Sequence, residues 1–171
     1  MIEWTKKNIK GIIDILKIDD IKGREALQTM RICRDGFAYV TNGYVAIRWK
    51  LETEPVPRDE NQKEFVIPLD KLIVWYKLHN AKDCLNELSI LELQDENNTT
   101  VYPDMARLFK QTINTPESKS CRVNLDLIKQ VHNATDCRNY MGYKMSFHNN
   151  VIYMEENKRK HTEILVMGLE L

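Results

Sequence analysis

Two histidine and cysteine pairs have the spacing in this sequence that is most suggestive of chemistry. The phrase "HNAKDC" runs from His79 to Cys84, and "HNATDC" runs from His132 to Cys137, with a single Lys-to-Thr change. Imidazole and thiolate groups are zinc ligands, and two such pairs would complete a four-ligand set. The competing interpretation is that a structural unit occurs twice and that the phrase marks the same corner of each copy.

The similarity between the two copies extends beyond the candidate ligands. Leu69-Asp70 matches Leu125-Asp126 upstream of the phrase, and both copies continue into an alternating apolar and polar segment. A zinc site would need only its ligands to match. Histidines near helix C-termini are also favourable without a metal, because partial positive charge opposes the helix dipole there. We therefore favour the repeat, and we expect no metal and no cofactor.

No motif in the sequence organises catalysis. It contains no Gly-rich phosphate loop, no HExxH zinc motif and no GxSxG nucleophile elbow, and its acidic residues are scattered. A cysteine and histidine nucleophile pair would meet in space rather than in sequence, so it stays open, but no feature points to one. We expect no catalytic residues and no enzymatic activity.

The composition is that of a globular protein whose net charge gives no strong overall electrostatic field. Of the 171 residues 43% are hydrophobic, and 25 basic residues balance 25 acidic ones. DNA binding would therefore need a local basic face. Four cysteines without a CxxC pair, no apolar leader and no long apolar span predict free thiols, a cytoplasmic location and no membrane association.

Hydrophobic periodicity predicts alternating helices and strands. Residues 5–18 repeat apolar side chains at i, i+3, i+4 and i+7, which is typical of an amphipathic helix, with Thr5 as its N-cap. In residues 27–52, β-branched and aromatic runs are broken by "RDG" and "TNG", a pattern of hairpins. The polar, Pro-containing segment 52–63 is a connector.

Two further units are expected after this connector. The second consists of a strand at 64–68, a helix at 69–84 and a strand at 87–94, and "TTVYPDMARLFKQTINTPESKS" (99–120) is a strand end and a linker. The third consists of a strand at 121–124, a helix at 125–137 and strands up to residue 171. The whole is an α+β chain of three strand-helix-strands units with a period near 55 residues.

The predicted helices carry basic residues away from their apolar stripes. Such a face could contact DNA phosphates without reading base sequence, although ordinary solvated faces give the same pattern. The candidate DNA-binding residues are Lys6, Lys10 and Lys17 in the first helix, Lys71 and Lys82 in the second, and Lys129 and Arg138 in or near the third.

Three phrases of the sequence resemble one known family. "YVTNGYVAIRW" (39–49) resembles the "ATDGhrLa" hairpin of the bacterial DNA polymerase sliding clamp, the β subunit of the replicase. "VYPDMARLF" (101–109) resembles that family's "FPDYrrvlP", and the terminal "ILVMGLEL" (164–171) resembles its "yvvMPmrL". The phrases occur in the family's order. Three residues depart from the pattern: Asn42 stands for Asp, Gly168 for Pro and Glu170 for Arg.

The resemblance implies a DNA-clamp fold with helices on one face of antiparallel sheets. Residues 1–112 would form a complete clamp-like domain of two units, and residues 119–171 would form half a domain. In the family the three phrases form a hydrophobic pocket that holds peptide motifs of polymerases and other replication proteins. The residues carried over are Thr41, Gly43, Tyr44, Val45 and Ala46; Pro103, Arg107 and Leu108; and Leu165, Val166, Met167 and Leu169. Core packing is the competing interpretation for each of them.

We consider three hypotheses, of which the first two follow from the resemblance and the third from the histidine and cysteine pairs. The first is a non-enzymatic sliding clamp of a reduced replication system, such as that of a phage or mobile element, which binds partner peptides and double-stranded DNA. Because rings of the family contain twelve helices, three units per chain would require a homotetramer. The second is a monomeric adaptor or decoy that keeps the peptide pocket without encircling DNA. The third is a small DNA-binding enzyme with a zinc site.

Overall fold

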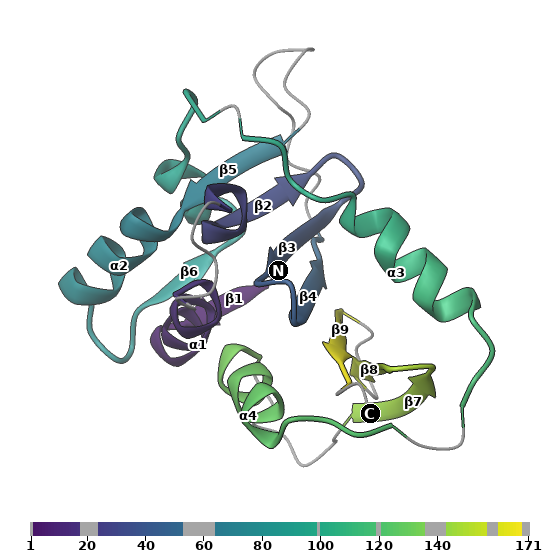
Figure 1. Ribbon diagram of the computed structural model, residues 1–171. Coiled ribbons are helices and arrows are strands. Elements are labelled where there is room, and N and C mark those ends of the chain that lie inside the picture. Colours follow the sequence, from purple (N-terminus) through teal and green to yellow (C-terminus); the bar gives the residue numbers. More distant parts are fainter. Residues whose placement is uncertain are drawn as a thin grey trace.

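A seven-stranded antiparallel sheet dominates the computed structural model, which describes residues 2–17, 24–52, 64–98, 100–118, 121–135, 143–156 and 161–168. The strand order is β5-β2-β3-β4-β9-β8-β7, so strands from both ends of the chain share one sheet, with the seam at the β4–β9 pair (Figure 1). The strands are β2 (Thr29–Cys33), β3 (Phe37–Thr41), β4 (Val45–Lys50), β5 (Glu64–Pro68), β7 (Tyr143–His148), β8 (Val151–Glu156) and β9 (Thr162–Met167).

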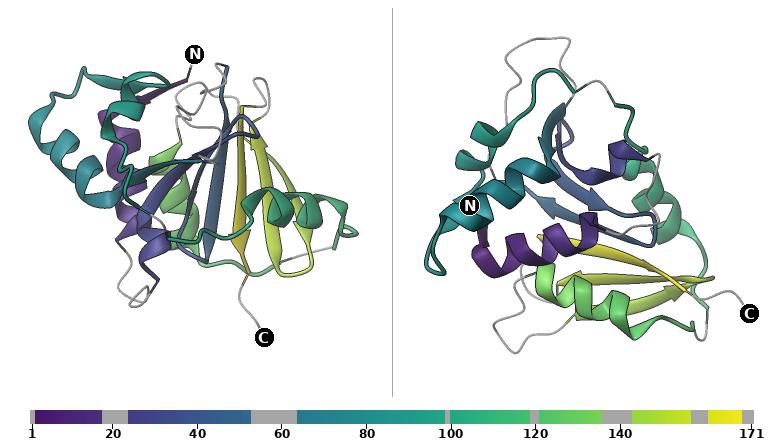
Figure 2. Two further views of the ribbon diagram at one scale, coloured as in Figure 1. Left: turned by 90° about the horizontal axis from the view of Figure 1, so that it is seen from above. Right: turned by 60° about the vertical axis from the view of Figure 1, so that its left-hand side comes forward.

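Helices lie on both faces of this sheet (Figure 2). On one face, which we call the inner face, are α1 (Lys6–Leu16), α2 (Leu69–Leu78) and α4 (Leu125–Ala134), with α1 in contact with both others. On the opposite, outer face is α3 (Met105–Asn114). The strands β1 (Glu3–Thr5) and β6 (Cys84–Asn86) form a separate pair. The predicted α+β arrangement of helices against antiparallel sheet is confirmed.

Strand alternation divides the buried side chains into two cores. Successive residues of a strand point to opposite faces of the sheet. In β4, Val45 and Ile47 belong to the inner core beneath the three helices, whereas Ala46 belongs to the outer core with Met105 and Phe109 of α3. The sheet is therefore covered on both faces along the seam.

The first helix forms where the sequence predicts it. Thr5 is the N-cap: its hydroxyl oxygen accepts from the Asn8 amide, and the Asn8 side chain accepts from the Thr5 amide at 2.9 Å, which completes a capping box. The predicted apolar stripe is buried, and so is Ile15 outside it, because α1 is flanked by α2 and α4 as well as by the sheet.

Three predicted elements are wrong. The predicted linker contains the ten-residue helix α3, whose N-cap Asp104 accepts from the Arg107 amide at 2.9 Å. The predicted strand 87–94 is instead the 3-10 helix η3 (Ser89–Leu93), because the Asn86 side chain accepts the Leu88 and Ser89 amides and turns the chain. In the predicted strand 121–124, only a Val123–Gly168 bridge forms. A further 3-10 helix, η2 (Glu25–Gln28), precedes β2.

The chain's first and last helices approach each other closely at Gly11. A Cβ atom at this position would overlap the backbone of Asn133 and Ala134 in α4. Gly11 and Ala134 are both buried. Small residues at such a crossing let helix backbones come together, at the cost of a residue that weakens the helix itself. The predicted division into 1–112 and 119–171 stays a prediction, while sheet and helix contacts both cross it.

Substitution of Gly11 by Ala tests this contact. In an open helix the change would add about 1 kcal/mol of stability through helix propensity. Here the added methyl group must push α1 and α4 apart, and we expect the free energy of unfolding to fall by roughly 1 to 3 kcal/mol. Urea denaturation of Gly11→Ala measures the change. Lys10→Ala, at the neighbouring exposed position, is the control and should stay within about 0.5 kcal/mol; a Gly11→Ala protein as stable as the original would refute the contact.

Candidate functional site

The hairpin and tail phrases meet at the seam of the sheet. In the β4–β9 pair, Val45 lies opposite Val166 and Ala46 lies opposite Leu165. Ala46 and Leu165 point to the outer face, where they contact residues of α3. This helix contains most of the remaining phrase, "VYPDMARLF". The structure therefore brings together all three segments from which the peptide pocket is predicted.

A partly buried charge cluster fastens α3 to the outer face. The Arg48 guanidinium lies over two rings, 4.6 Å from the centre of Phe37 and 4.4 Å from that of Phe109 in α3. It pairs with Glu163 at 2.7 Å, and the Tyr153 hydroxyl donates to the same carboxylate at 2.8 Å. Cation–π contacts and a shared carboxylate hold this planar group in place. Sequence patterning did not reveal the cluster, because its members come from five separate elements.

A second arginine fixes the segment that leads into α3. Arg31 is fully buried, pairs with Glu64, and donates from Nη2 to the Thr100 hydroxyl at 2.7 Å and to the Thr100 carbonyl at 3.1 Å. Its guanidinium lies 5.0 Å from the centre of the Tyr102 ring. Desolvation on burial raises the pKa of the neighbouring Cys33 thiol to about 12, and the charges of Asp35 and Glu64 add to this.

The predicted pocket residues divide into exposed and buried groups. The large apolar side chains of Tyr44, Leu108 and Met167 are 48%, 43% and 47% exposed, and the Met167 amide donates to the Tyr44 carbonyl at 2.8 Å. We call these three residues the peptide surface. Pro103, Arg107 and Gly43 are also exposed. Thr41, Val45, Ala46, Leu165 and Val166 are buried, and Leu169 lies outside the described residues.

Turn chemistry explains why Thr41 is buried and why Asn42 replaces the family's Asp. The Thr41 hydroxyl donates to the Val45 carbonyl at 2.8 Å and accepts from the Gly43 amide. The Asn42 side-chain oxygen accepts from the amides of Tyr44 and Val45, both at 2.9 Å. An amide oxygen serves here as well as a carboxylate, and Gly43 supplies the positive φ of 91°. These hydrogen bonds shape the hairpin, while the buried Asn42 Nδ2 has no hydrogen-bond partner among the described residues.

The departure at Gly168 also has a local cause. Its amide donates to the Asn150 carbonyl, and a Cβ atom would lie 2.6 Å from the Cys121 sulfur and 2.9 Å from the Arg122 carbonyl oxygen. Proline has no N–H to donate and could not occupy this space. The backbone after Met167 is therefore tied to the β7–β8 turn. Glu170, the third departure, lies outside the described residues.

The candidate DNA-binding residues lie on the inner helices and the turn after α2. Lys10, Lys17, Lys71, Lys82 and Lys129 are exposed, and Arg138 lies outside the described residues. Lys10 pairs with Asp14 on the next turn of α1. Lys6 is half-buried: its ammonium lies 4.7 Å from the centre of the Tyr76 ring and donates to the His79 carbonyl.

The repeated phrases end α2 and α4 as the repeat interpretation predicts. His79 is the C-cap of α2, stacks on Trp75 at 4.5 Å and shares a hydrogen bond with its carbonyl. His132 lies exposed in the last turn of α4, and Cys137 lies outside the described residues. Within the described part of the chain, no group of three or more His, Cys, Asp or Glu side chains could hold a metal ion. None of the helices described there is long and apolar enough to cross a membrane.

Comparison with solved structures identifies the fold. The chain is similar to the DNA polymerase III β subunit of Borrelia burgdorferi in complex with a natural product (TM-score 0.58, 12% identity) and to the DNA polymerase sliding clamp of Pseudomonas aeruginosa (0.60, 11%). It is also similar to the Helicobacter pylori β clamp bound to a DNA ligase peptide (0.57, 13%). Each match covers 99% of this chain and 64% to 66% of the clamp.

These matches show that the chain has the fold of bacterial sliding clamps, as the three phrases imply, and that it spans just under two thirds of the length of those clamps. No protein-family model and no curated protein sequence matches it significantly. The likeness is therefore one of structure, carried at low sequence identity.

Proposed function

We propose that this chain is a non-enzymatic, clamp-like protein of a DNA replication system that binds peptide motifs of polymerases or other replication proteins. The observation that carries the proposal is the peptide surface: Tyr44, Leu108 and Met167 come from three separate segments and expose large apolar side chains beside the β4–β9 seam. Flexible methionine and leucine side chains suit the capture of apolar peptide residues. The fold match to a clamp that holds a ligase peptide supports it.

The buried members of the predicted pocket have a different role in this proposal. Val45 and Val166 belong to the inner core, so their side chains face away from the peptide surface. Ala46 and Leu165 lie beneath α3 and support it. Pro103, Arg107 and Gly43 would form the rim. The ligand would thus contact the exposed side chains, while the buried ones fix the position of the strands that carry them.

A charge at Met167 tests the peptide surface. Binding of the DNA ligase peptide that the Helicobacter pylori clamp binds can be followed by fluorescence polarisation. We expect Met167→Asp to weaken binding by at least about 30-fold, because an apolar anchor typically contributes 2 kcal/mol or more. Val74→Asp, on exposed α2 at the opposite face, is the matched control and should bind normally.

If Met167→Asp does not fold, a second variant tests the peptide surface instead. Leu108→Asp changes an exposed residue of α3 and should also weaken binding. If either folded variant binds the peptide as tightly as the original protein, the peptide surface is assigned wrongly.

The proposal extends to DNA along the inner helices. Exposed lysines on α1, α2 and α4 outnumber the carboxylates there, although the chain as a whole is neutral. Contacts of this kind would be to phosphates and would release counterions. A replication role of this type, in a phage or mobile element, would place the protein in the cytoplasm.

Charge reversal on two inner helices tests the DNA face. Lys10→Glu and Lys71→Glu should weaken binding to duplexes of unrelated sequence equally, and each lost phosphate contact should lower the slope of log K against log salt by about 0.9. Lys110→Glu, exposed on α3 at the outer face, makes the same charge change where no DNA contact is expected. Equal weakening by all three variants would indicate net charge alone, and no weakening would remove the DNA face.

The second candidate is a monomeric adaptor or decoy that keeps the peptide surface without encircling DNA. The observation in its favour is the zero net charge of the chain, which gives no long-range attraction to DNA. The inner face carries three helices, so a ring of twelve would need four chains. Sedimentation at high protein concentration separates the two: a tetramer fits the ring, whereas a strictly monomeric particle that binds the ligase peptide fits the adaptor.

A further inference from the structure

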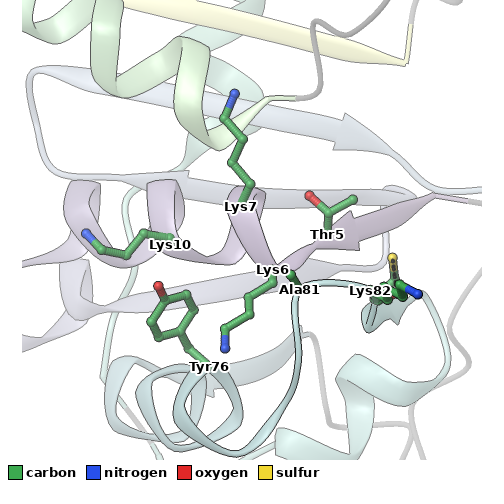
Figure 3. Close-up of a pocket in the computed structure, with 8 residues that line it drawn as sticks. Thr5, Lys6, Lys7, Lys10, Tyr76, Ala81 and Lys82 are labelled. Atoms are coloured by element: carbon green, nitrogen blue, oxygen red, sulfur yellow. Dashed lines mark hydrogen bonds between the residues drawn. The ribbon is translucent and has the colours of Figure 1, made fainter.

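A cavity of about 880 Å³ opens between the start of α1 and the turn that follows α2 (Figure 3). Its walls include Lys6, Lys7 and Lys10 from α1, Lys82 from the turn, and the ring of Tyr76 from α2. Its volume falls within the range of small-molecule sites. It lies on the inner face and shares no residue with the peptide surface.

The walls of this cavity are strongly basic. Four lysines line it, although the Lys7 ammonium points away on the other side of α1, and none of the described residues in its walls is acidic. Among the residues that the structure describes, Lys10 is the only one of these lysines with a carboxylate partner, Asp14, which is one turn further along the helix. The ammonium groups of Lys6, Lys10 and Lys82 repel each other, and a multivalent anion would relieve that repulsion. A single phosphodiester, with one negative charge, would neutralise only part of it.

The arrangement of the side chains also favours an anion. Figure 3 shows Lys6 extending toward Tyr76, whereas Lys10 runs along α1 and Lys7 leaves the helix on the other side. The cavity is at the N-terminal end of α1, where the helix dipole favours negative charge. The polar edge of the cavity thus comes from two elements, α1 and the turn containing Lys82, that the β1–β6 pair holds side by side.

We propose that this cavity binds a compact, multiply charged phosphate group, such as the triphosphate of a nucleotide. The lysines would neutralise the phosphate oxygens, and Lys10 would exchange Asp14 for the ligand. The phosphates of a DNA backbone offer the same chemistry from another source. The inference rests on the proposed function only for that second source, since a free polyphosphate needs no DNA-facing surface.

The exposed thiol of Cys84 gives a local readout, because it also lines the cavity. Its alkylation by iodoacetamide can be followed on the peptide that contains it by mass spectrometry, with tripolyphosphate, ATP or a nicked circular duplex added at constant ionic strength. At ten times its Kd, a bound ligand should slow alkylation about tenfold. The half-buried Cys33, with its pKa raised to about 12, is the internal reference and should stay unreactive throughout.

Variants of the wall make the test specific. Lys6→Gln with Lys82→Gln should abolish protection by tripolyphosphate, whereas Asp14→Asn should increase it by freeing Lys10. Lys110→Gln and Glu117→Gln make the same charge changes at exposed sites away from the cavity and should leave protection unchanged.

The three added ligands distinguish a free polyphosphate from a DNA backbone. Protection by tripolyphosphate and ATP that responds to the wall variants supports the inference, whether or not the duplex protects. If neither tripolyphosphate nor ATP slows alkylation of Cys84, the inference is overturned. Protection by the duplex alone would overturn it too, while leaving the proposed DNA face intact. Protection by polyphosphate without any DNA binding would support the inference and remove the proposed DNA face.

Discussion

The close approach of α1 to α4 at Gly11 is the constraint on which the rest of the molecule depends. These helices belong to opposite ends of the chain, and their backbones touch where a side chain would otherwise intervene. Their contact sets the distance between the strands beneath them, so β4 and β9 can pair over five residues. Without that pairing the sheet would gain two further open edges, at β4 and β9, each with unsatisfied backbone groups.

The seam places two surfaces back to back. Alternate residues of β4 and β9 face the inner helices, which carry the exposed lysines. The residues between them face α3 and the peptide surface. A displacement of the seam would therefore alter both surfaces together. The Arg48 cluster and the Arg31 anchor act only on the outer side, where they hold α3 and the segment before it against the sheet.

Local signals in the sequence predicted much of this fold, and contacts between distant residues explain most of the rest. The capped helix at Thr5, the "TNG" hairpin and the positions of His79 and His132 near the ends of their helices depend on neighbouring residues, and they are where the patterns place them. The predicted helix 69–84 is too long, because α2 ends at Leu78 and Cys84 begins β6. The three phrases also predicted the clamp fold. Helix α3 carries an amphipathic pattern of its own, but its apolar stripe is explained by a partner, the outer face of the sheet, that no local pattern reveals. The contacts of Arg31 and Arg48 are not visible in the sequence for the same reason.

In the candidate site, the resemblance names the residues of the pocket, but strand geometry decides which of them can contact a ligand. Position-by-position transfer names twelve pocket residues, yet side chains on adjacent strand positions cannot face the same ligand. Alternation alone separates Val45 from Ala46 and Val166 from Leu165, and α3 then covers one pair while the inner helices cover the other. What remains accessible is the end of the seam, where Tyr44 and Met167 pass beyond the cover of α3. A ligand-binding surface at this place follows from the geometry of a sheet covered on both faces, because only its uncovered end can offer apolar side chains to a partner.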